Sequence, residues 1–359
     1  MRIAQIAPLW ERVPPPAYGG TEAVVSTLTD ELVRRGHDVT LFATGDSQTL
    51  AMLEPGCETG LRSLGVLPPE YAVYEQMQLS KAFKRAGEFD LIHSHMDFAA
   101  LPYASFTKTP VIHTIHGILT PLVEQIYTQH RQQNFVSISN SQRREDLKLN
   151  YVATVYNAIA TEQFKFYRKP DEPPYLAFLG RMSVEKGPHL AIAIAKRTGL
   201  PLKMAGKVDF ENREFFDREV APHIDGKQIE FLGEADTRLK NELMGRAIAT
   251  LFPITWREPF GLVMIESMAS GTPVIAMSLG SAPEVIADGK TGFLCENLEA
   301  CVAAVAKVEK LDRRTCREHV EDNFSVRRMV DGYEAAYQQI LIDRFVNNGH
   351  LRSPMLKAS

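Results

Sequence analysis

Short apolar runs alternate with helical patterns along the chain, and the alternation occurs twice, on either side of a proline-dense break. In the first round, strands are predicted at residues 3–7, 38–43, 90–93, 111–115, 135–139 and 153–156. In the second round, strands are predicted at residues 175–180, 202–205, 229–232, 249–252 and 273–277. Runs that are apolar on both faces and separated by helices indicate parallel sheets covered on both sides.

Helical periodicity fills the intervals between these strands. Residues 21–35 place Val24, Val25, Leu28 and Leu32 on one side, and Gly36 is positioned to end that helix. Further helices are predicted near residues 188–197, 211–221, 237–246, 297–310 and 312–323. A long final helix is predicted from Ser325 to residue 342, and its buried side comprises Met329, Tyr333, Ala336, Tyr337 and Ile340.

Proline and polar residues separate the two rounds at residues 167–174. A segment of this composition is typical of a stiff linker between domains. We therefore predict an α/β protein with an N-terminal domain at residues 1–167 and a C-terminal domain at residues 175–324. Ligands of open parallel sheets lie outside the carboxyl ends of the strands. The cleft between the two domains is thus the expected site.

Composition argues against several classes of protein. The net charge of -4 disfavours a nucleic-acid partner, which would need a basic face. No apolar run approaches the ~20 residues of a transmembrane segment. The four cysteines form no C-x-x-C pair and have no histidine at zinc spacing, so we expect reduced cysteines in a cytoplasmic protein.

The stretch that begins at Glu258 is predicted to bring a helix N-terminus to the carboxyl edge of the second sheet. Strand 249–252 ends in a short loop, and a helix is expected to begin near Phe260. Free backbone N–H groups and the helix dipole attract phosphate to such an end. Glu258 lies just outside it and Glu266 about two turns inside, which suits sugar hydroxyls and a ribose diol. Ordinary first-turn and surface glutamates are the structural alternative.

Two cations and two glycines occupy further strand-to-helix loops. Arg181 and Lys186 follow the first strand of the second round, where they are placed to neutralise a diphosphate. Lys207 is a weaker candidate of the same kind. Gly19 and Gly20 lead into a helix and would let the backbone approach a phosphate or a sugar. A tight loop with positive φ is the alternative explanation for these glycines.

Histidines cluster at the ends of two neighbouring strands. His116 ends strand 111–115 and is placed to hydrogen-bond a sugar hydroxyl or the reacting centre. His113 is expected in the core, whereas His93 and His95 are expected to line the acceptor side. No carboxylate stands at metal-ligand spacing and no D-x-D occurs, so neither a metal site nor a cofactor is expected.

Several enzyme classes lack their sequence signatures in this chain. The G-x-G-x-x-G fingerprint is absent after the first strand of each round, which disfavours a nicotinamide-dependent oxidoreductase. There is no Ser-His-Asp order, no G-x-S-x-G elbow and no P-loop lysine motif. Hydrolase and kinase interpretations are therefore disfavoured as well.

Taken in order, these motifs resemble a family-4 retaining glycosyltransferase with the GT-B fold. The resemblance covers nearly the whole chain and rests on residues 18–22, 116–117, 180–181, 185–187, 258–261 with Glu266, 283–286 and 288–292. It implies two Rossmann-like, doubly wound domains that face each other across a cleft. It also implies that the final helix, at about residues 325–345, crosses back to the N-terminal domain.

The resemblance implies transfer of a hexose from a nucleoside-diphosphate sugar, UDP-glucose-like, to a hydroxyl acceptor. The reaction would retain the anomeric configuration, need no metal, and proceed by front-face attack. The implied site comprises Arg181 and Lys186 on the diphosphate, Glu258 on the donor sugar, Glu266 on the ribose, the backbone of Phe260, Gly261 and Leu262 on sugar and phosphate, Gly19 and Gly20 over the diphosphate, and His116 facing the sugar.

Other functions and partners stay open at this point. A nucleotide-sugar epimerase, a sugar phosphorylase and a non-catalytic sugar-nucleotide binding protein would suit the same architecture. The acceptor is expected to be a small molecule, a saccharide or a lipid-linked molecule. Arg143, Arg144 and Lys148 would suit weak contact with a membrane surface, although a solvated helix face explains them more simply.

Overall fold

Two parallel sheets organise the computed structural model, which describes residues 1–17 and 19–347. The N-terminal sheet has the strand order β3-β2-β1-β4-β5-β6-β7 and the C-terminal sheet the order β10-β9-β8-β11-β12-β13. The N-terminal strands are β1 (Arg2–Ile6), β2 (Asp38–Thr44), β3 (Met52–Cys57), β4 (Leu91–Ser94), β5 (Val111–Ile115), β6 (Asn134–Ser137) and β7 (Tyr151–Thr154). The C-terminal strands are β8 (Leu176–Leu179), β9 (Leu202–Ala205), β10 (Ile229–Phe231), β11 (Ala249–Phe252), β12 (Val274–Met277) and β13 (Gly292–Cys295).

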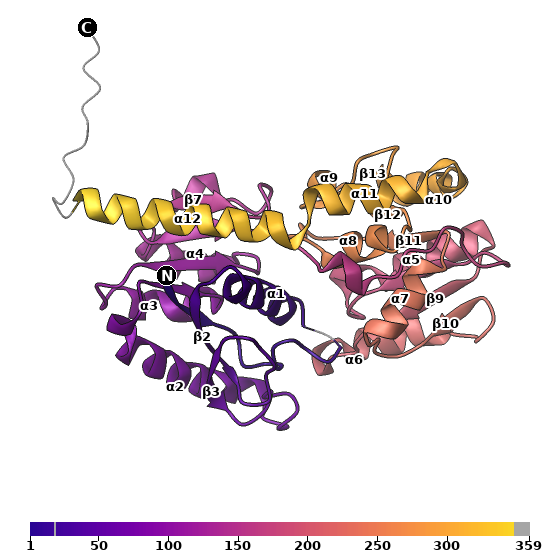
Figure 1. Cartoon of the computed structure of the whole chain (residues 1–359). Helices are drawn as coiled ribbons and strands as arrows, with labels where there is room; N and C mark the ends of the chain where they lie inside the picture. Colours follow the sequence, from indigo (N-terminus) through magenta and orange to yellow (C-terminus); the bar gives the residue numbers. More distant parts are fainter. Residues whose placement is uncertain (18, 348–359) are drawn as a thin grey trace, which may run out of the picture.

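Helices surround both sheets, and the domains lie side by side (Figure 1). The N-terminal domain carries α1 (Gly20–Arg34), α2 (Tyr71–Lys84), α3 (Leu101–Ala104) and α4 (Pro121–Gln129). The C-terminal domain carries α5 (Pro188–Thr198), α6 (Arg213–Phe215), α7 (Thr237–Gly245), α8 (Leu262–Ala269), α9 (Ala282–Val285), α10 (Leu298–Val305) and α11 (Arg313–Asn323). The last helix is α12 (Val326–Asn347). The doubly wound α/β fold is confirmed, while the boundary residues of the domains stay a prediction.

The sequence predictions did not include strands β3 and β13 or helix α2. Strands β3 and β13 lie at sheet edges, and β3 contains a proline and a glycine, which weaken a strand pattern. Helix α2 buries only Gln78, Leu79 and Ala82, so its apolar stripe is narrow. The helix predicted at 211–221 is wrong in detail, because short 3₁₀, α and π turns replace it.

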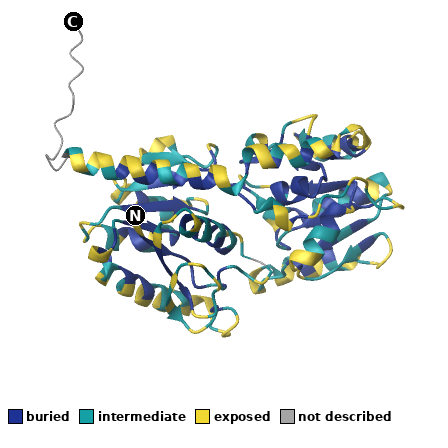
Figure 2. Cartoon of the chain, viewed as in Figure 1, coloured by how far each residue is buried: buried dark blue, intermediate teal, exposed yellow. Residues whose placement is uncertain are grey.

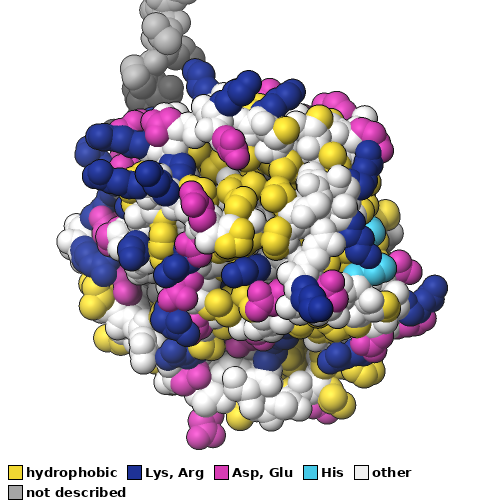
Figure 3. All heavy atoms as spheres, turned by 90° about the vertical axis from the view of Figure 1, so that its right-hand side faces the viewer, with side chains coloured by type: hydrophobic (Ala, Val, Ile, Leu, Met, Phe, Trp, Pro, Cys, Tyr) yellow, Lys and Arg dark blue, Asp and Glu magenta, His cyan; other side chains and the backbone are white. Residues whose placement is uncertain are grey.

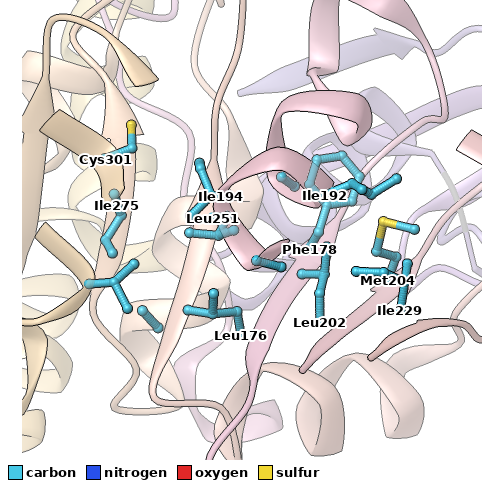
Figure 4. Close-up of a cluster of buried hydrophobic side chains, with 14 of the residues drawn as sticks. Leu176, Phe178, Ile192, Ile194, Leu202, Met204, Ile229, Leu251, Ile275 and Cys301 are labelled. Carbon is cyan, nitrogen blue, oxygen red and sulfur yellow. The ribbon is translucent and has the colours of Figure 1, made fainter. Parts of the chain in front are cut away.

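Apolar side chains from one face of the C-terminal sheet pack against α5 and α10 (Figure 4). Two further clusters bury the other face against α7 and α8. Phe178 and Met204 contribute from neighbouring strands, and Ile192 and Ile194 contribute from α5. Figure 2 shows the sheets buried and the outer faces of the helices exposed. Burial on both sides explains why these strands are apolar almost throughout. At the exposed end of this domain, acidic and basic side chains are interspersed (Figure 3).

Helix α12 leaves the C-terminal domain and lies along the N-terminal one (Figure 1). Its side chains Met329, Tyr333, Ala336, Tyr337 and Ile340 are buried there, as predicted. Charged contacts reinforce the packing of α12 beside α1. The guanidinium of Arg35 lies 2.7 Å from Asp331 and 2.7 Å from Glu334. The GT-B crossover implied by the resemblance is therefore present.

Arg143, Arg144 and Lys148, the basic residues considered for weak membrane contact, do not lie on the face of a regular helix. The interpretation of these residues as a solvated helix face was therefore wrong. Their segment contains a 3₁₀ turn at Glu145–Leu147, and Lys148 has a left-handed φ of 51°. Arg144 pairs with Glu124 and Asp146 within the protein. No helix within residues 1–17 and 19–347 is long and apolar enough to cross a membrane.

Glu284 of α9 joins the C-terminal domain to a loop of the N-terminal domain. Its carboxylate accepts hydrogen bonds from the backbone N–H groups of Asn140 (2.7 Å) and Ser141 (2.6 Å) and from the hydroxyl of Tyr156 (2.8 Å). Arg257 adds a bond of 3.1 Å to the carbonyl oxygen of Ser141. One carboxylate thus fixes the spacing of the two domains on this side.

We expect Glu284→Ala to lower the free energy of unfolding by about 1.5–3 kcal/mol, because it leaves backbone donors without their charged acceptor. Urea denaturation followed by circular dichroism measures this change. Glu296→Ala removes an exposed carboxylate from the same domain and should leave the midpoint unchanged. Equal midpoints for the two variants would show that Glu284 does not hold the domains together.

Candidate functional site

A cavity of about 700 Å³ lies between the two domains. The predicted residues Gly19 and Gly20 line it from the N-terminal domain, and Leu262 and Glu266 line it from the C-terminal domain. Tyr18, which belongs to the 18–22 motif, lies outside the described residues. Four of the residues that the resemblance assigns to donor binding therefore line one cavity, although the two pairs are more than 200 residues apart in the chain.

The N-termini of α1 and α8 meet at this cavity. Gly20 and Leu262 begin the two helices, and a Cβ added at Gly20 would lie 3.6 Å from Leu262 Cδ1. Gly19 has φ 150°, and a Cβ there would lie 2.7 Å from Pro15 Cβ, so a larger residue would be strained. Because the first N–H groups of a helix lack intrahelical partners, two such ends favour an anionic ligand.

Helix α8 begins two residues later than predicted. Gly261 precedes it with a left-handed φ of 78°, and Phe260 is buried against Tyr156 and Phe324 instead of starting the helix. Glu266 therefore lies about one turn inside the helix, not two. Its side chain is 10% exposed at the cavity wall, and its Oε1 lies 3.6 Å from Lys240 Nζ.

Lys186 and Glu258 form an ion pair that joins the loops after β8 and β11. The Lys186 Nζ to Glu258 Oε2 distance is 2.5 Å, and the two side chains are 17% and 9% exposed. Trp256 Nε1 donates a second hydrogen bond of 2.7 Å to the same oxygen, and its ring lies 5.0 Å from Lys186 Nζ. Glu258 is thus held by two donors before any ligand binds.

Arg181 belongs to a second charged set. Its guanidinium lies 3.6 Å from Glu185 and 3.8 Å from Asp209, and Asp209 also lies 3.5 Å from Lys207 Nζ. Lys207 lines the cavity. The Asp209 carboxylate thus lies between Arg181 and Lys207. An anionic group of a ligand would suit the same position between these two cations.

His116 lies on the N-terminal side, at the carboxyl end of β5. Its backbone N–H donates to Asp97 Oδ1 (3.2 Å), and its Nε2 lies 2.8 Å from Nδ1 of His95. Burial lowers the pKa of His116 to about 4, so its imidazole is neutral near pH 7. In the described chain, no hydrogen bond joins His116 to Lys186 or Glu258.

His93 and His95 are more deeply buried than predicted. His93 and His95 are at most 1% exposed and do not line an open acceptor surface. Their hydrogen bonds go to Tyr337, Thr114, Gln5 and His116 inside the domain. His113 is buried near Phe135, as predicted.

Partly exposed polar groups surround His116 at the same sheet edge. Trp10 Nε1 donates to Glu75 Oε1 (3.0 Å), and Asp97 has a left-handed φ of 44°. Burial raises the pKa of Asp97 to about 6, against backbone N–H groups that lower it. Burial likewise raises the pKa of Glu75, and the nearby Asp97 carboxylate adds to the shift. Nothing in residues 1–17 and 19–347 groups three potential metal ligands.

Comparison with known proteins identifies the family. A model described as Glycosyltransferase Family 4 matches residues 18–175, and one described as Glycosyl transferases group 1 matches residues 160–323. The chain belongs to glycosyltransferase family 4. Its two facing sheets and returning helix are the GT-B fold that the resemblance implied.

Relatives of this family-4 glycosyltransferase match it over most of their length. It is 26% identical to the glycogen synthase of Mycobacterium tuberculosis H37Rv, covering 87% of this chain and 86% of that protein. It is also 26% identical to the N-acetyl-alpha-D-glucosaminyl L-malate synthase of Bacillus anthracis, covering 91% and 96%. AviGT4, a glycosyltransferase of avilamycin A biosynthesis, matches with a TM-score of 0.70 at 23% identity, covering 96% and 98%. HepE of Anabaena, solved with UDP and glucose, matches with a TM-score of 0.69 at 19% identity, covering 97% and 100%.

Residues that sequence reasoning missed support the Glu258 loop of this glycosyltransferase. The Ser281 N–H donates to the Glu258 carbonyl (2.9 Å), and the Ser281 Oγ donates to the Phe260 carbonyl (2.7 Å). Gly280 has φ 58°, and a Cβ there would overlap the Glu258 backbone. A Leu-Gly-Ser sequence directly after strand 273–277 indicates a turn at this position. The sequence does not show that this turn contacts the Glu258 loop, which lies some twenty residues earlier in the chain.

Gly280→Ala should displace the Glu258 loop and lower both donor affinity and transfer. Gly289→Ala is the matched control, because Gly289 has φ 71° but nothing within 4 Å of an added Cβ. Both variants carry the roughly 1–2 kcal/mol cost of a left-handed alanine. Thermal unfolding and nucleotide titration separate the effects, and unchanged nucleotide affinity in Gly280→Ala would disprove the support role.

Proposed function

We propose that this family-4 glycosyltransferase moves a hexose, with retention of configuration and without a metal, from a nucleoside-diphosphate sugar to a hydroxyl acceptor. The observation that supports this most is the meeting of two helix N-termini at one interdomain cavity, which Gly180 and Lys207 of the loops after β8 and β9 also line. Preorganised N–H groups and cations stabilise negative charge where it develops in a reaction. A leaving diphosphate develops such charge.

In this proposal the residues divide the donor between them. Arg181 and Lys186 bind the diphosphate, and Gly19 and Gly20 approach it from the other domain. Glu258 accepts hydrogen bonds from the sugar hydroxyls, Glu266 binds the ribose diol, and the backbone of Phe260, Gly261 and Leu262 contacts sugar and phosphate. His116 faces the sugar.

The transfer step is a substitution at the anomeric carbon. The acceptor oxygen forms a bond to the anomeric carbon while the bond between that carbon and the diphosphate oxygen breaks. The acceptor attacks from the face of the sugar that the diphosphate leaves. The acceptor proton passes to the leaving phosphate oxygen, so no protein base is required. A double displacement would need a carboxylate at the anomeric carbon. Glu258, the carboxylate that this proposal places on the donor sugar, is instead held by Lys186 and Trp256.

Relatives indicate which donor to test first. HepE of Anabaena has been solved with UDP-glucose, which makes UDP-glucose the first donor. Relatives named for glycogen, phosphatidyl-myo-inositol and malate show that acceptors differ widely within the family. A small molecule, a saccharide and a lipid-linked acceptor should therefore each be assayed. Released UDP together with a glycosylated product separates transfer from epimerisation, phosphorolysis and simple binding.

We expect Lys186→Ala to lower the transfer rate by at least about 100-fold, because it removes a cation from the departing diphosphate. Glu258→Ala should lower transfer similarly but leave UDP affinity equal or higher, because Lys186 then loses its competing carboxylate. Turnover assays with and without EDTA, together with calorimetry of UDP binding, test both variants. Lys290→Ala, at an exposed site of the same domain, is the control. Weaker UDP binding in Glu258→Ala would contradict the proposed division of roles.

Glu266→Ala should weaken UDP by about tenfold or more, since a hydrogen bond to a charged group contributes about 1.5–3 kcal/mol. A nucleotide lacking the 2′-hydroxyl provides the control. The wild type should lose affinity for this analogue, whereas Glu266→Ala should bind it and UDP almost equally. If both proteins discriminate the analogue to the same extent, Glu266 does not bind the ribose.

A further inference from the structure

A chain of hydrogen bonds runs from α12 through the N-terminal sheet to His116. Its members in order are Tyr333, Thr114, His93, Tyr337, Gln5, His95 and His116. All except His116 are at most 1% exposed. Strand alternation explains the alignment, because Gln5, His93 and Thr114 project from the face of the sheet that α12 covers.

Distances around Tyr337 give the chain a direction. Its hydroxyl lies 2.7 Å from His93 Nδ1 but 3.3 Å from Gln5 Nε2. Hydroxyl donors typically form shorter bonds than amide donors. The phenol therefore donates to His93 and accepts from the Gln5 amide. In the reverse direction a hydroxyl would donate across 3.3 Å, which is long for such a bond.

The remaining protons follow, because a neutral imidazole has one donor and one acceptor nitrogen. Burial lowers the pKa of both His93 and His95 well below the usual value, so both are neutral. His93 accepts at Nδ1 and donates from Nε2 to Thr114 (2.7 Å). The oxygen of Gln5 accepts from His95 Nε2 (2.9 Å), which leaves His95 Nδ1 to accept from His116 Nε2 (2.8 Å).

His116 is consequently left with one open position. Its Nε2 carries the proton that His95 accepts, so its Nδ1 is an acceptor. This Nδ1 has no hydrogen-bond partner in the described chain and is not among the enclosed unpaired atoms. A ligand hydroxyl that reaches His116 would therefore meet a lone pair and not an N–H group.

We propose that Tyr337 and Gln5 are positioning residues that fix His116 as its Nε2–H tautomer, so that Nδ1 accepts a hydrogen bond from a hydroxyl of the bound sugar. The contact with sugar rests on the proposed function, whereas the tautomer does not. A neutral acceptor beside the sugar adds no positive charge to a centre that becomes cationic during transfer. Helix α12, which follows the C-terminal domain, thereby sets the chemistry of a residue in the opposite domain.

Nitrogen NMR of ¹⁵N-histidine-labelled full-length protein at pH 7 tests this proposal, because the two tautomers have different imidazole signals. His116→Asn identifies the His116 signals by their loss. We expect the wild type to show a protonated Nε2 and an unprotonated Nδ1 at His116. A protonated Nδ1, or an even mixture of tautomers, would overturn the proposal. No donor or turnover is needed, so this outcome is independent of the proposed function.

Tyr337→Phe and Tyr333→Phe form a matched pair, because each removes one buried hydroxyl from the same helix. Tyr337→Phe frees the Gln5 amide to turn over, so His116 should become a mixture of tautomers. In active protein, the apparent affinity for the donor should then fall about two- to tenfold, following the fraction left competent. Tyr333→Phe leaves Thr114 able to accept from His93 and should keep the wild-type tautomer. An unchanged tautomer in folded Tyr337→Phe, or equal changes in both variants, would also overturn the proposal.

Discussion

The part-buried ion pair between Lys186 and Glu258 is the contact on which the C-terminal half of the site depends. Removing Lys186 would leave the buried Glu258 carboxylate without its charged partner, which is far more costly than losing an exposed pair. The two loops are also joined through their backbones, since the Thr255 N–H donates to the Glu185 carbonyl (3.0 Å). Gly187 allows this approach, because a Cβ there would overlap the Pro253 carbonyl. Helix α8 starts four residues after Glu258, so these contacts also set where its N-terminus lies.

The N-terminal domain meets this assembly with a helix end of its own. The starts of α1 and α8 come close to each other at Gly20 and Leu262, while Glu284 and α12 tie the domains on other sides. The position of the two domains around the cavity is therefore set by contacts that do not involve a ligand. A diphosphate would add charge that the two helix ends and the nearby cations can neutralise.

Much of the fold was predictable, because burial on both faces makes strands such as β8 and β12 apolar from end to end. Edge strand β3 lacks that pattern, because it contains a glutamate, a proline and a glycine, and it was missed. Edge strand β13 was missed as well, although its four residues are apolar or glycine. The start of α8 was misplaced because Phe260 extends the apolar periodicity, although Gly261 at φ 78° interrupts the backbone. Side-chain partners were harder to predict. Arg181 and Lys186 are recognisable as loop cations, but Asp209 and Trp256 come close to them only in the folded chain. The environment of His93 and His95 depends on Tyr337, some 240 residues later in the chain.

A crystal structure of the protein with an intact sugar nucleotide would show directly where the donor binds. We expect the diphosphate between the α1 and α8 N-termini, with a phosphate oxygen about 3 Å from Lys186 Nζ or from the Arg181 guanidinium. We also expect a sugar hydroxyl within hydrogen-bond reach of Glu258. A diphosphate bound outside the interdomain cavity, or one that touches neither cation, would contradict the proposed donor site.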